Sequence, residues 1–559
     1  MKTRSLLAVF ALSVIPLIAA GVHAKDITHD AEYYVIEAQN GERWNADDKV
    51  IEQKLSEFYS RNGNKPPNII YILLDDLGFG EIGMPGLDVI RGYSTPNINK
   101  LAQSGMSLQR MYTEPSCTPT RVAFLTGRHP IRTGLNEAKV TLVGEGLPDE
   151  EVTIAEVLRE AGYTTSHVGK WHQGDIEQSF AHKQGFDRAE FPIHQQAQLA
   201  LMNPQAEQSD ITRGMGIDGD FPRELFLDDT FIPNSSGMLT GVELRDGKLY
   251  EVDMKPGEVW TQEKYQQMNK RYQASVLREL GDLATRKEPF FLNYWPLYPV
   301  SFVRNDNGKF RTRNGGSFTE AMIEVDDWIG EIIDEVDRLG IAENTIIMVM
   351  GDNGTMTQYV GLSGASDRIY RGGKGDHLEG GVRVNAFVSW PGMIDAGSMA
   401  EDIFHVSDLF TSFARFGKAM DEVPRDRVID GVDQTGVLLL GEAHGRRDYV
   451  YIYEQDSLKS IVKNKFKFHL PPPMTNPILS AEFYDLYRDP REERPEQSIK
   501  MGTWGSGAFG GMLKRHMAMK KKYPDRKPTY ATPYEGIENL RPETLEMVEA
   551  FKASKKVGR

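Results

Sequence analysis

Continuous apolar runs alternate with amphipathic stretches along much of this chain. Residues 68–74 (NIIYILL) and 345–350 (TIIMVM) form unbroken runs rich in β-branched side chains, which is typical of strands buried on both faces of a parallel sheet. Residues 320–339 carry apolar side chains at helical spacing, and Gly340 follows them as a stop before the second run. The alternation predicts an α/β fold in which helices cover both faces of one sheet.

Local capping signals mark two further helices. Pro96 stands at the first position of one helix, and Gly105 ends it. Thr153 and Glu156 have the spacing of a capping box for a helix over residues 154–160. Both helices fall between the two apolar runs, as the α/β interpretation requires.

The pattern of the chain changes at several places. We interpret residues 25–65, which are polar with one helical stretch around residues 50–59, as an N-terminal extension. The main α/β domain is expected over residues 66–445, with a small β insertion at about residues 210–267, where short alternating pieces replace the apolar runs. Residues 446–559 are expected to form a smaller C-terminal subdomain of short strands, followed by a tail.

The N-terminus has the pattern of a secretory leader. Lys2 and Arg4 precede an apolar run over residues 6–20, and residues 22–24 (VHA) fit a small-residue cleavage site. The run is shorter than the roughly 20 residues that span a bilayer as a helix, and no later stretch is apolar enough. We therefore expect a signal peptide over residues 1–24, no membrane span, and a periplasmic or secreted mature protein.

The charge balance limits the possible partners. The 559 residues carry a formal net charge of −15, which repels nucleic acid and argues against a nucleic-acid partner. The same charge repels an anionic substrate. A site for such a substrate must therefore gather cationic side chains locally.

Cys117 is the only cysteine of the chain, so it forms no internal disulfide. It stands at the start of a helix predicted over residues 118–125 and ended by Gly127. A group at a helix N-terminus faces unpaired backbone N–H groups, which favour anions, and Arg121 lies one turn further on. These residues alone leave two interpretations open, a reactive site and an inert buried thiol.

Two pairs of oxygen-bearing side chains follow the two apolar runs. Asp75 and Asp76 come directly after the first run, and Asp352 and Asn353 lie just beyond the second. Ligands of open α/β sheets gather at the carboxyl ends of the strands. Carboxylate and amide oxygens suit Ca²⁺ or Mg²⁺, and such a cluster repels itself without a cation. Simple turns are the alternative for each pair taken alone.

Several motifs of the chain resemble, in order, the signature of the type I sulfatases. This family is formylglycine-dependent, arylsulfatase-like and belongs to the alkaline-phosphatase superfamily. The resemblance covers roughly residues 66–495. The matching motifs are Asp75-Asp76, CTPTR at residues 117–121 with LTGR at 125–128, GKWH at 169–172, GDNG at 351–354, RGGK at 371–374 with EGGVR at 379–383, DGVD at 430–433 and YDLYRDPRE at 484–492.

The resemblance implies a fold and an activity. The fold is a large mixed sheet between helices, with a smaller antiparallel sheet packed by a C-terminal helix. The activity is hydrolysis of sulfate esters to an alcohol and inorganic sulfate, with sulfated carbohydrates among the candidate substrates. The resemblance also implies a formylglycine-generating enzyme as a partner during maturation.

The resemblance further implies roles for nine residues. Cys117 would be oxidised to formylglycine (3-oxoalanine), whose hydrate is the nucleophile. Ca²⁺, with Mg²⁺ as the alternative, would be held by the residue at position 117 together with Asp75, Asp76, Asp352 and Asn353. The other catalytic residues would be Arg121, Lys170, His172 and Lys374, of which Lys170 and Lys374 bind the sulfate and His172 takes a proton from the hydrate.

The chain departs from the family pattern at one turn. Family members often carry a histidine after a strand like residues 290–292 (FFL), but residues 297–301 (LYPVS) have none. His377 and Tyr298 are the candidate replacements for protonating the leaving alcohol. Two other functions stay open at this point. One is a formylglycine-dependent phosphonate monoester or phosphodiester hydrolase, and the other is a non-catalytic binder of sulfated glycans.

Overall fold

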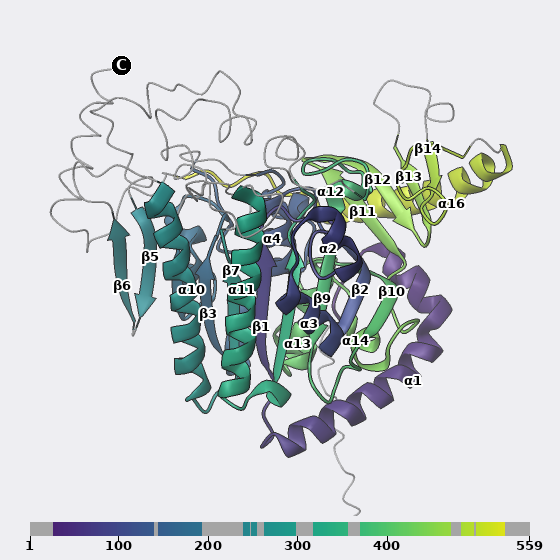
Figure 1. Ribbon diagram of the computed structural model, residues 1–559. Helices are drawn as coiled ribbons and strands as arrows, with labels where there is room; N and C mark the ends of the chain where they lie inside the picture. Colours follow the sequence, from purple (N-terminus) through teal and green to yellow (C-terminus); the bar gives the residue numbers. More distant parts are fainter. Residues whose placement is uncertain are drawn as a thin grey trace, which may run out of the picture.

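The computed structural model describes residues 26–138, 144–192, 239–245, 247–253, 262–297, 317–355, 369–470, 482–496 and 499–531 (Figure 1). The predicted signal peptide and most of the predicted β insertion lie outside these residues. None of the helices in the described ranges combines the length and the apolar character needed to cross a membrane.

A large mixed sheet is the centre of the fold. The described strands run in the order β10-β2-β9-β8-β1-β7-β3-β4-β5-β6. The central strands β8, β1, β7, β3 and β4 are parallel, and β9 runs antiparallel between β8 and β2. The bounds are β1 Asn68–Leu74, β2 Met106–Tyr112, β3 Thr164–Gly169, β4 Arg188–Phe191, β5 Leu239–Arg245, β6 Lys248–Asp253, β7 Phe290–Trp295, β8 Thr345–Gly351, β9 Arg383–Ser389 and β10 Ser398–His405.

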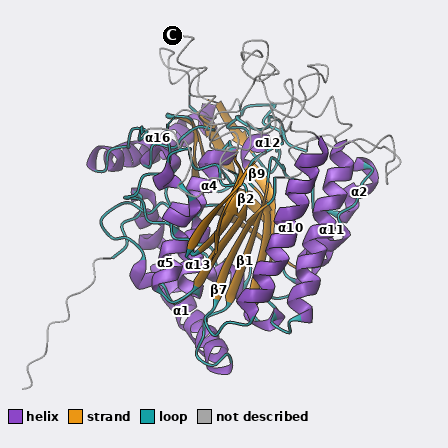
Figure 2. Ribbon diagram, turned by 90° about the vertical axis from the view of Figure 1, so that its left-hand side faces the viewer, coloured by secondary structure: helices purple, strands orange, loops and turns teal. Residues whose placement is uncertain are grey.

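Helices cover both faces of this sheet, as the apolar runs predict (Figure 2). Alternate residues of β1 point to opposite faces: Ile70 and Ile72 pack with α3, α10 and α11, while Ile69 and Tyr71 pack with α1, α4, α5 and α13. The capping box of Thr153 is present. The helix bounds are α1 Ala31–Arg61, α2 Pro85–Arg91, α3 Pro96–Ser104, α4 Cys117–Thr126, α5 Ile154–Glu160, α10 Gln262–Ala284, α11 Ser317–Arg338, α12 Glu379–Val382, α13 Asp408–Phe416, α14 Thr435–Leu440 and α16 Ile499–Lys522.

The N-terminal segment differs from the prediction. The expected helical stretch around residues 50–59 is the end of a helix that begins at Ala31, and this helix packs against α14 and α16. The first half of the helix buries only two apolar side chains, Ile36 and Trp44, eight residues apart, so the helical pattern is weak there. The second half buries Ile51, Leu55 and Phe58 at helical spacing, which is the stretch that the sequence indicates.

The strands β5 and β6 fall within the predicted insertion. They form a hairpin, and β5 pairs antiparallel with β4. The described part of the predicted insertion therefore extends the edge of the large sheet.

A second, smaller sheet is antiparallel, as the family resemblance implies. Its order is β11-β12-β13-β14, and it lies on the β2–β10 side of the molecule (Figure 1). Helix α16 packs on it through Phe509, whose ring lies 5.3 Å from Phe468 and 5.5 Å from Phe483. The strand bounds are β11 Tyr449–Glu454, β12 Ser457–Lys463, β13 Phe466–His469 and β14 Glu482–Asp485.

Two of the sequence motifs meet at the junction between the sheets. The fully buried Lys467 lies with its Nζ 3.1 Å from Glu379 Oε1 and 3.0 Å from Glu492 Oε1. Glu492 also accepts a hydrogen bond from the backbone N–H of Glu379 at 2.7 Å, and its Oε1 lies 2.7 Å from His469 Nε2. The EGGVR and YDLYRDPRE motifs therefore join the small sheet to the large one.

Replacing Glu492 by glutamine is expected to lower the free energy of unfolding at neutral pH, by an amount that decreases in acid. Burial raises the pKa of Glu492, but the charge of Lys467 and the hydrogen bond from His469 outweigh it and lower the pKa from 4.5 to about 2. A carboxylate with a depressed folded pKa stabilises the protein above the unfolded pKa, and this stability is lost as the pH falls from 4.5 toward 2. The full effect is on the order of 3 kcal/mol.

Denaturant unfolding of wild type and Glu492→Gln between pH 7 and pH 2 measures this effect. The difference in unfolding free energy should be constant at neutral pH and shrink below pH 4.5. A difference that stays constant down to pH 2 would show that Glu492 is not held as a carboxylate.

Candidate active site

The two acidic pairs predicted from the sequence lie side by side. Leu74 of β1 is paired with Gly351 of β8, so the residues that follow the two strands meet at one edge of the sheet. The backbone N–H of Asp76 donates to Asp352 Oδ1 at 2.8 Å, and Asn353 Nδ2 donates to Asp76 Oδ1 at 2.8 Å. All of these side chains are buried.

Cys117 lies beside this acidic cluster. It is the first residue of α4, and the preceding Ser116 has extended backbone angles. Ligand atoms of Asp75, Asp76 and Cys117 all lie within 4.8 Å of one another. The helix ends at Gly127 with a left-handed φ of 66°, as its sequence predicts. The N-terminus of α4 therefore brings position 117 to the carboxylates.

Two buried cations face the same carboxylates. Arg121 Nη2 donates to Asp75 Oδ1 at 3.1 Å and to Asp352 Oδ2 at 2.7 Å. The Arg121 guanidinium also lies 4.7 Å from the centre of the Trp295 ring. Lys170 Nζ donates to Asp75 Oδ1 at 2.5 Å. The positive charge that the acidic surface lacks is thus present at this site.

Lys374 reaches the site from a separate loop. Its Nζ lies 2.8 Å from Asp76 Oδ1. The backbone N–H of Lys374 donates to Thr355 O at 3.0 Å, and that of Gly375 donates to Pro115 O at 2.7 Å. This loop is therefore held against the segment that leads into Cys117.

The GKWH motif forms a constrained turn after β3. The backbone N–H of Lys170 donates to Trp295 O at 2.7 Å. Gly169 has a φ of 102°, and a Cβ there would lie 2.1 Å from Trp295 O, so only glycine fits. His172 also has a left-handed φ, 58°, which is costly for a residue with a side chain. Its predicted role toward position 117 stays a prediction.

The electrostatics of the cluster fit a bound divalent cation. Burial and the charge of Asp75 raise the pKa of Asp352 well above its usual value. Burial also raises the pKa of Asp75, but Lys170 and Arg121 outweigh it and hold that pKa below its usual value. Asn353 Oδ1 is buried and has no hydrogen-bond partner among the described residues. An orphaned amide oxygen beside three carboxylates is a donor set for a hard cation such as Ca²⁺.

Comparison with known proteins decides the family. The chain matches the family described as Sulfatase over residues 67–417. The chain is a type I sulfatase. This sulfatase is 30% identical over 507 residues to the steryl-sulfatase of Rattus norvegicus, with 77% of this chain and 85% of the relative covered. It is 30% identical over 420 residues to the N-acetylgalactosamine-6-sulfatase of Mus musculus, with 73% and 72% covered.

A solved structure supports the same assignment. The sulfatase PsFucS1 from Pseudoalteromonas sp. superimposes with a TM-score of 0.72 at 27% identity, covering 87% of this chain and 96% of that one. The alkaline-phosphatase-like fold expected from the sequence is therefore confirmed. The sulfatase is a sulfuric ester hydrolase, which favours sulfate esters over phosphonates and an enzyme over a binder.

The two candidate groups for protonating the leaving alcohol and a third set of side chains remain to be placed in the fold. His377 Nδ1 lies 2.6 Å from Glu454 Oε1, so this histidine is tied to the small sheet. Tyr298, the other candidate acid, lies outside the described residues. A buried cluster of Glu114, His129 and His405 was not predicted. Its sequence signal is weak: Glu114 and His129 flank the nucleophile motif, but His405 is distant in the chain.

Proposed function

We propose that this sulfatase acts through a formylglycine made from Cys117, with a calcium ion at the adjacent acidic cluster. The observation that carries the proposal is the buried contact of Asp75, Asp76 and Cys117, whose ligand atoms lie within 4.8 Å of one another. Modification would take place before or during export to the periplasm or the medium, by a formylglycine-generating enzyme. The reaction releases inorganic sulfate from a sulfate ester.

Asp75, Asp76, Asp352 and Asn353 would hold the ion, together with the oxygen of residue 117. Asn353 Oδ1 is the described donor that lacks a partner, and Asp352 is the carboxylate whose pKa is raised by repulsion. When bound, Ca²⁺, with Mg²⁺ as the alternative, supplies Lewis acidity and stabilises negative charge on oxygen. The same donor set argues against zinc, which prefers nitrogen and sulfur ligands.

Residue 117 provides the nucleophile. A hydrated formylglycine has two hydroxyl groups on one carbon, one to attack sulfur and one whose deprotonation expels the sulfate. His172, two residues beyond Lys170 in the constrained turn, would accept the proton of the second hydroxyl. A histidine is suited to this step because its neutral ring accepts a proton near neutral pH.

The three cations would have different roles, and only Lys374 is partly exposed. The side chains of Arg121 and Lys170 are 0% and 2% exposed, and that of Lys374 is 19% exposed. Arg121, which contacts both Asp75 and Asp352, would orient the carboxylates, while Lys170 would bind a sulfate oxygen. Lys374, on the open side, would also contact the bridging oxygen and stabilise the leaving alkoxide. His377 and Tyr298 are the candidate groups for protonating that alkoxide.

We infer that the alcohol part of the substrate is a carbohydrate. A cavity of about 430 Å³ lies beside the nucleophile segment and is bordered by Ser116 and Gly375. Its lining includes the polar side chains of Asn136, Glu137 and Gln455. A steroid would require a largely apolar pocket, whereas a sugar requires hydrogen-bonding groups of this kind. The rat and mouse relatives, each 30% identical, are named for a sterol and for an amino sugar, so the polar lining of the cavity carries this inference.

Turnover of matched esters tests this function. Protein with confirmed modification of Cys117 is expected to release sulfate from sulfated monosaccharides and aryl sulfates. The kcat/KM for these sulfate esters should exceed the kcat/KM for the corresponding phosphonate monoesters by at least about a hundredfold. A preference for the phosphonates would assign the alternative hydrolase activity, and faster turnover of steryl sulfates than of sugar sulfates would contradict the carbohydrate assignment.

A further inference from the structure

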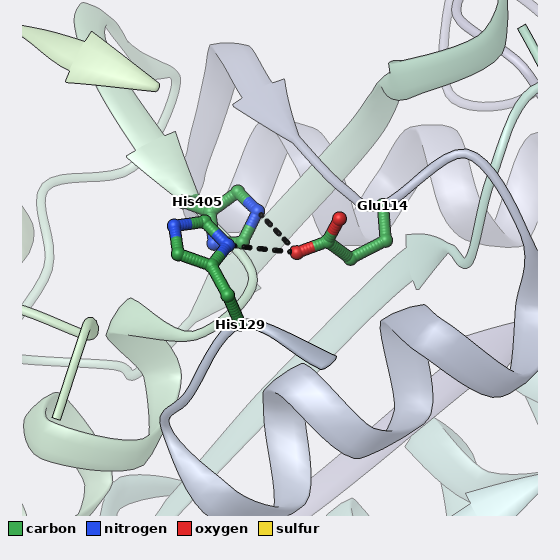
Figure 3. A group of neighbouring side chains, drawn as sticks. All are labelled: Glu114, His129 and His405. Atoms are coloured by element: carbon green, nitrogen blue, oxygen red, sulfur yellow. Dashed lines mark hydrogen bonds and ion pairs between the residues drawn. The ribbon is translucent and has the colours of Figure 1, made fainter. Parts of the chain in front are cut away.

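A second cluster of metal-ligating side chains lies apart from the acidic pairs (Figure 3). Glu114 precedes Cys117 by three residues, His129 follows α4, and His405 is the last residue of β10. Their side chains are between 1% and 3% exposed. Glu114 Oε1 lies 3.0 Å from His129 Nδ1 and 3.6 Å from His405 Nε2. Two segments that flank α4 and one that is distant in the sequence thus bring two imidazoles to one carboxylate oxygen.

One of these ring nitrogens makes no hydrogen bond in the described part of the chain. It is His405 Nε2, which is buried. Its distance of 3.6 Å from Glu114 Oε1 is too long for a hydrogen bond. The other ring nitrogen, Nδ1, lies 2.8 Å from Ser407 Oγ, which fixes the ring so that Nε2 faces Glu114 (Figure 3). A simple ion pair of His129 with Glu114 would leave this nitrogen unsatisfied, which is unfavourable in a buried site.

The spacing of the ligand atoms fits a tetrahedral metal ion. Zinc binds imidazole nitrogen and carboxylate oxygen at about 2.0–2.2 Å, which places neighbouring ligands of a tetrahedron about 3.4 Å apart. The two distances from Glu114 Oε1, 3.0 and 3.6 Å, lie on either side of this value. Two histidines and one carboxylate are also the donor type that zinc prefers, in contrast to the oxygen-only set of the acidic pairs.

We propose that Glu114, His129 and His405 form a second metal site that binds Zn²⁺. Glu114 also lines the cavity of about 430 Å³ described above, through which the ion would enter and from which a water molecule would supply the fourth ligand. With Nε2 on the metal, His405 Nδ1 would carry the proton and donate it to Ser407 Oγ at 2.8 Å, in place of accepting a hydrogen bond from the backbone N–H of Ser407 at 3.3 Å.

The proposed ion would fix the segment that leads into the nucleophile. Both the backbone N–H and the backbone C=O of Glu114 are hydrogen-bonded to Thr120 Oγ1, each at 3.1 Å. Glu114 therefore connects the zinc site to α4, whose first residue is Cys117. The zinc site would hold position 117 in register with the acidic pairs.

Zinc uptake by the full-length protein tests the proposal. Protein kept in calcium is freed of zinc with a zinc-selective chelator and then titrated with Zn²⁺ against a chromogenic indicator. Wild type is expected to bind one Zn²⁺ per chain, and His405→Gln should bind it at least about a hundredfold more weakly. The matched control is His444→Gln. His444 Nδ1 also lies 3.0 Å from a carboxylate oxygen, that of Asp47, but no third ligand accompanies the pair among the described residues.

A spectroscopic measurement needs no variant, and so it also covers the case in which His405→Gln fails to fold. Co²⁺ added to zinc-depleted wild type in the presence of calcium should give the intense visible bands of a four- or five-coordinate site, and Zn²⁺ should abolish them. Absence of stoichiometric Zn²⁺ binding would overturn the proposal, as would equal binding by His405→Gln. The weak bands of six-coordinate Co²⁺ would overturn it as well.

Discussion

The variant Cys117→Ala is expected to lose turnover entirely, by at least about ten-thousandfold in kcat, because the covalent nucleophile is removed. Its fold should remain, since Cys117 is a small buried side chain at the start of α4 and alanine keeps its Cβ. Release of sulfate from an aryl sulfate measures the first expectation, and the melting temperature measures the second. Residual activity near the wild-type level would contradict the mechanism.

The matched variant Cys117→Ser separates loss of the nucleophile from loss of structure. Serine can attack sulfur through its single hydroxyl, but it has no second hydroxyl with which to expel the sulfate. We therefore expect at most one sulfate trapped per chain, and no further turnover. Sustained turnover by this variant would show that the second hydroxyl is not needed.

Removal of calcium is expected to reduce turnover to the background level. Without a cation, the pKa of the buried Asp352 is raised well above its usual value by burial and by the charge of Asp75. Chelation should therefore both stop catalysis and lower the melting temperature, because an ion that binds only the folded state stabilises it. Added Ca²⁺ should restore both quantities. Full activity after exhaustive chelation would contradict a metal at this site.

The variant Asn353→Ala tests whether Asn353 is a ligand of this metal. The calcium concentration needed for half-maximal activity should rise at least about tenfold, because a ligand oxygen is lost. The control is Asn385→Ala, which removes another buried amide, one whose Oδ1 accepts a hydrogen bond from Gly80 N at 2.5 Å. An equal calcium shift in both variants would mean that the effect is one of stability alone.

Much of the fold could be predicted because its signals are local. The strands β1 and β8 are unbroken apolar runs, and the capping box of α5 is formed by Thr153 and Glu156, three residues apart. The sequence predicts α1 too short because the first half of the helix buries only Ile36 and Trp44, which pack with the small sheet and α16. Such tertiary partners override a weak local pattern.

The meeting of the two acidic pairs could be predicted from the sequence because strand topology alone determines it. Asp75 and Asp352 meet because β1 and β8 are parallel neighbours, so their carboxyl ends coincide. The contact of Arg121 with both of these carboxylates needed the structure. The same is true of the junction of Glu379 with Glu492, which are 113 positions apart. Glycine-rich motifs that suggest catalysis can thus carry residues whose contacts join two sheets.

The central claim is that position 117 is an aldehyde in the active enzyme. Mass spectrometry of the peptide that contains residue 117, from active protein isolated from its native host, tests it most directly. We predict the mass of formylglycine or its hydrate at this position, in a fraction that rises in proportion to kcat across preparations. Fully active protein that carries an unmodified thiol at Cys117 would contradict the account.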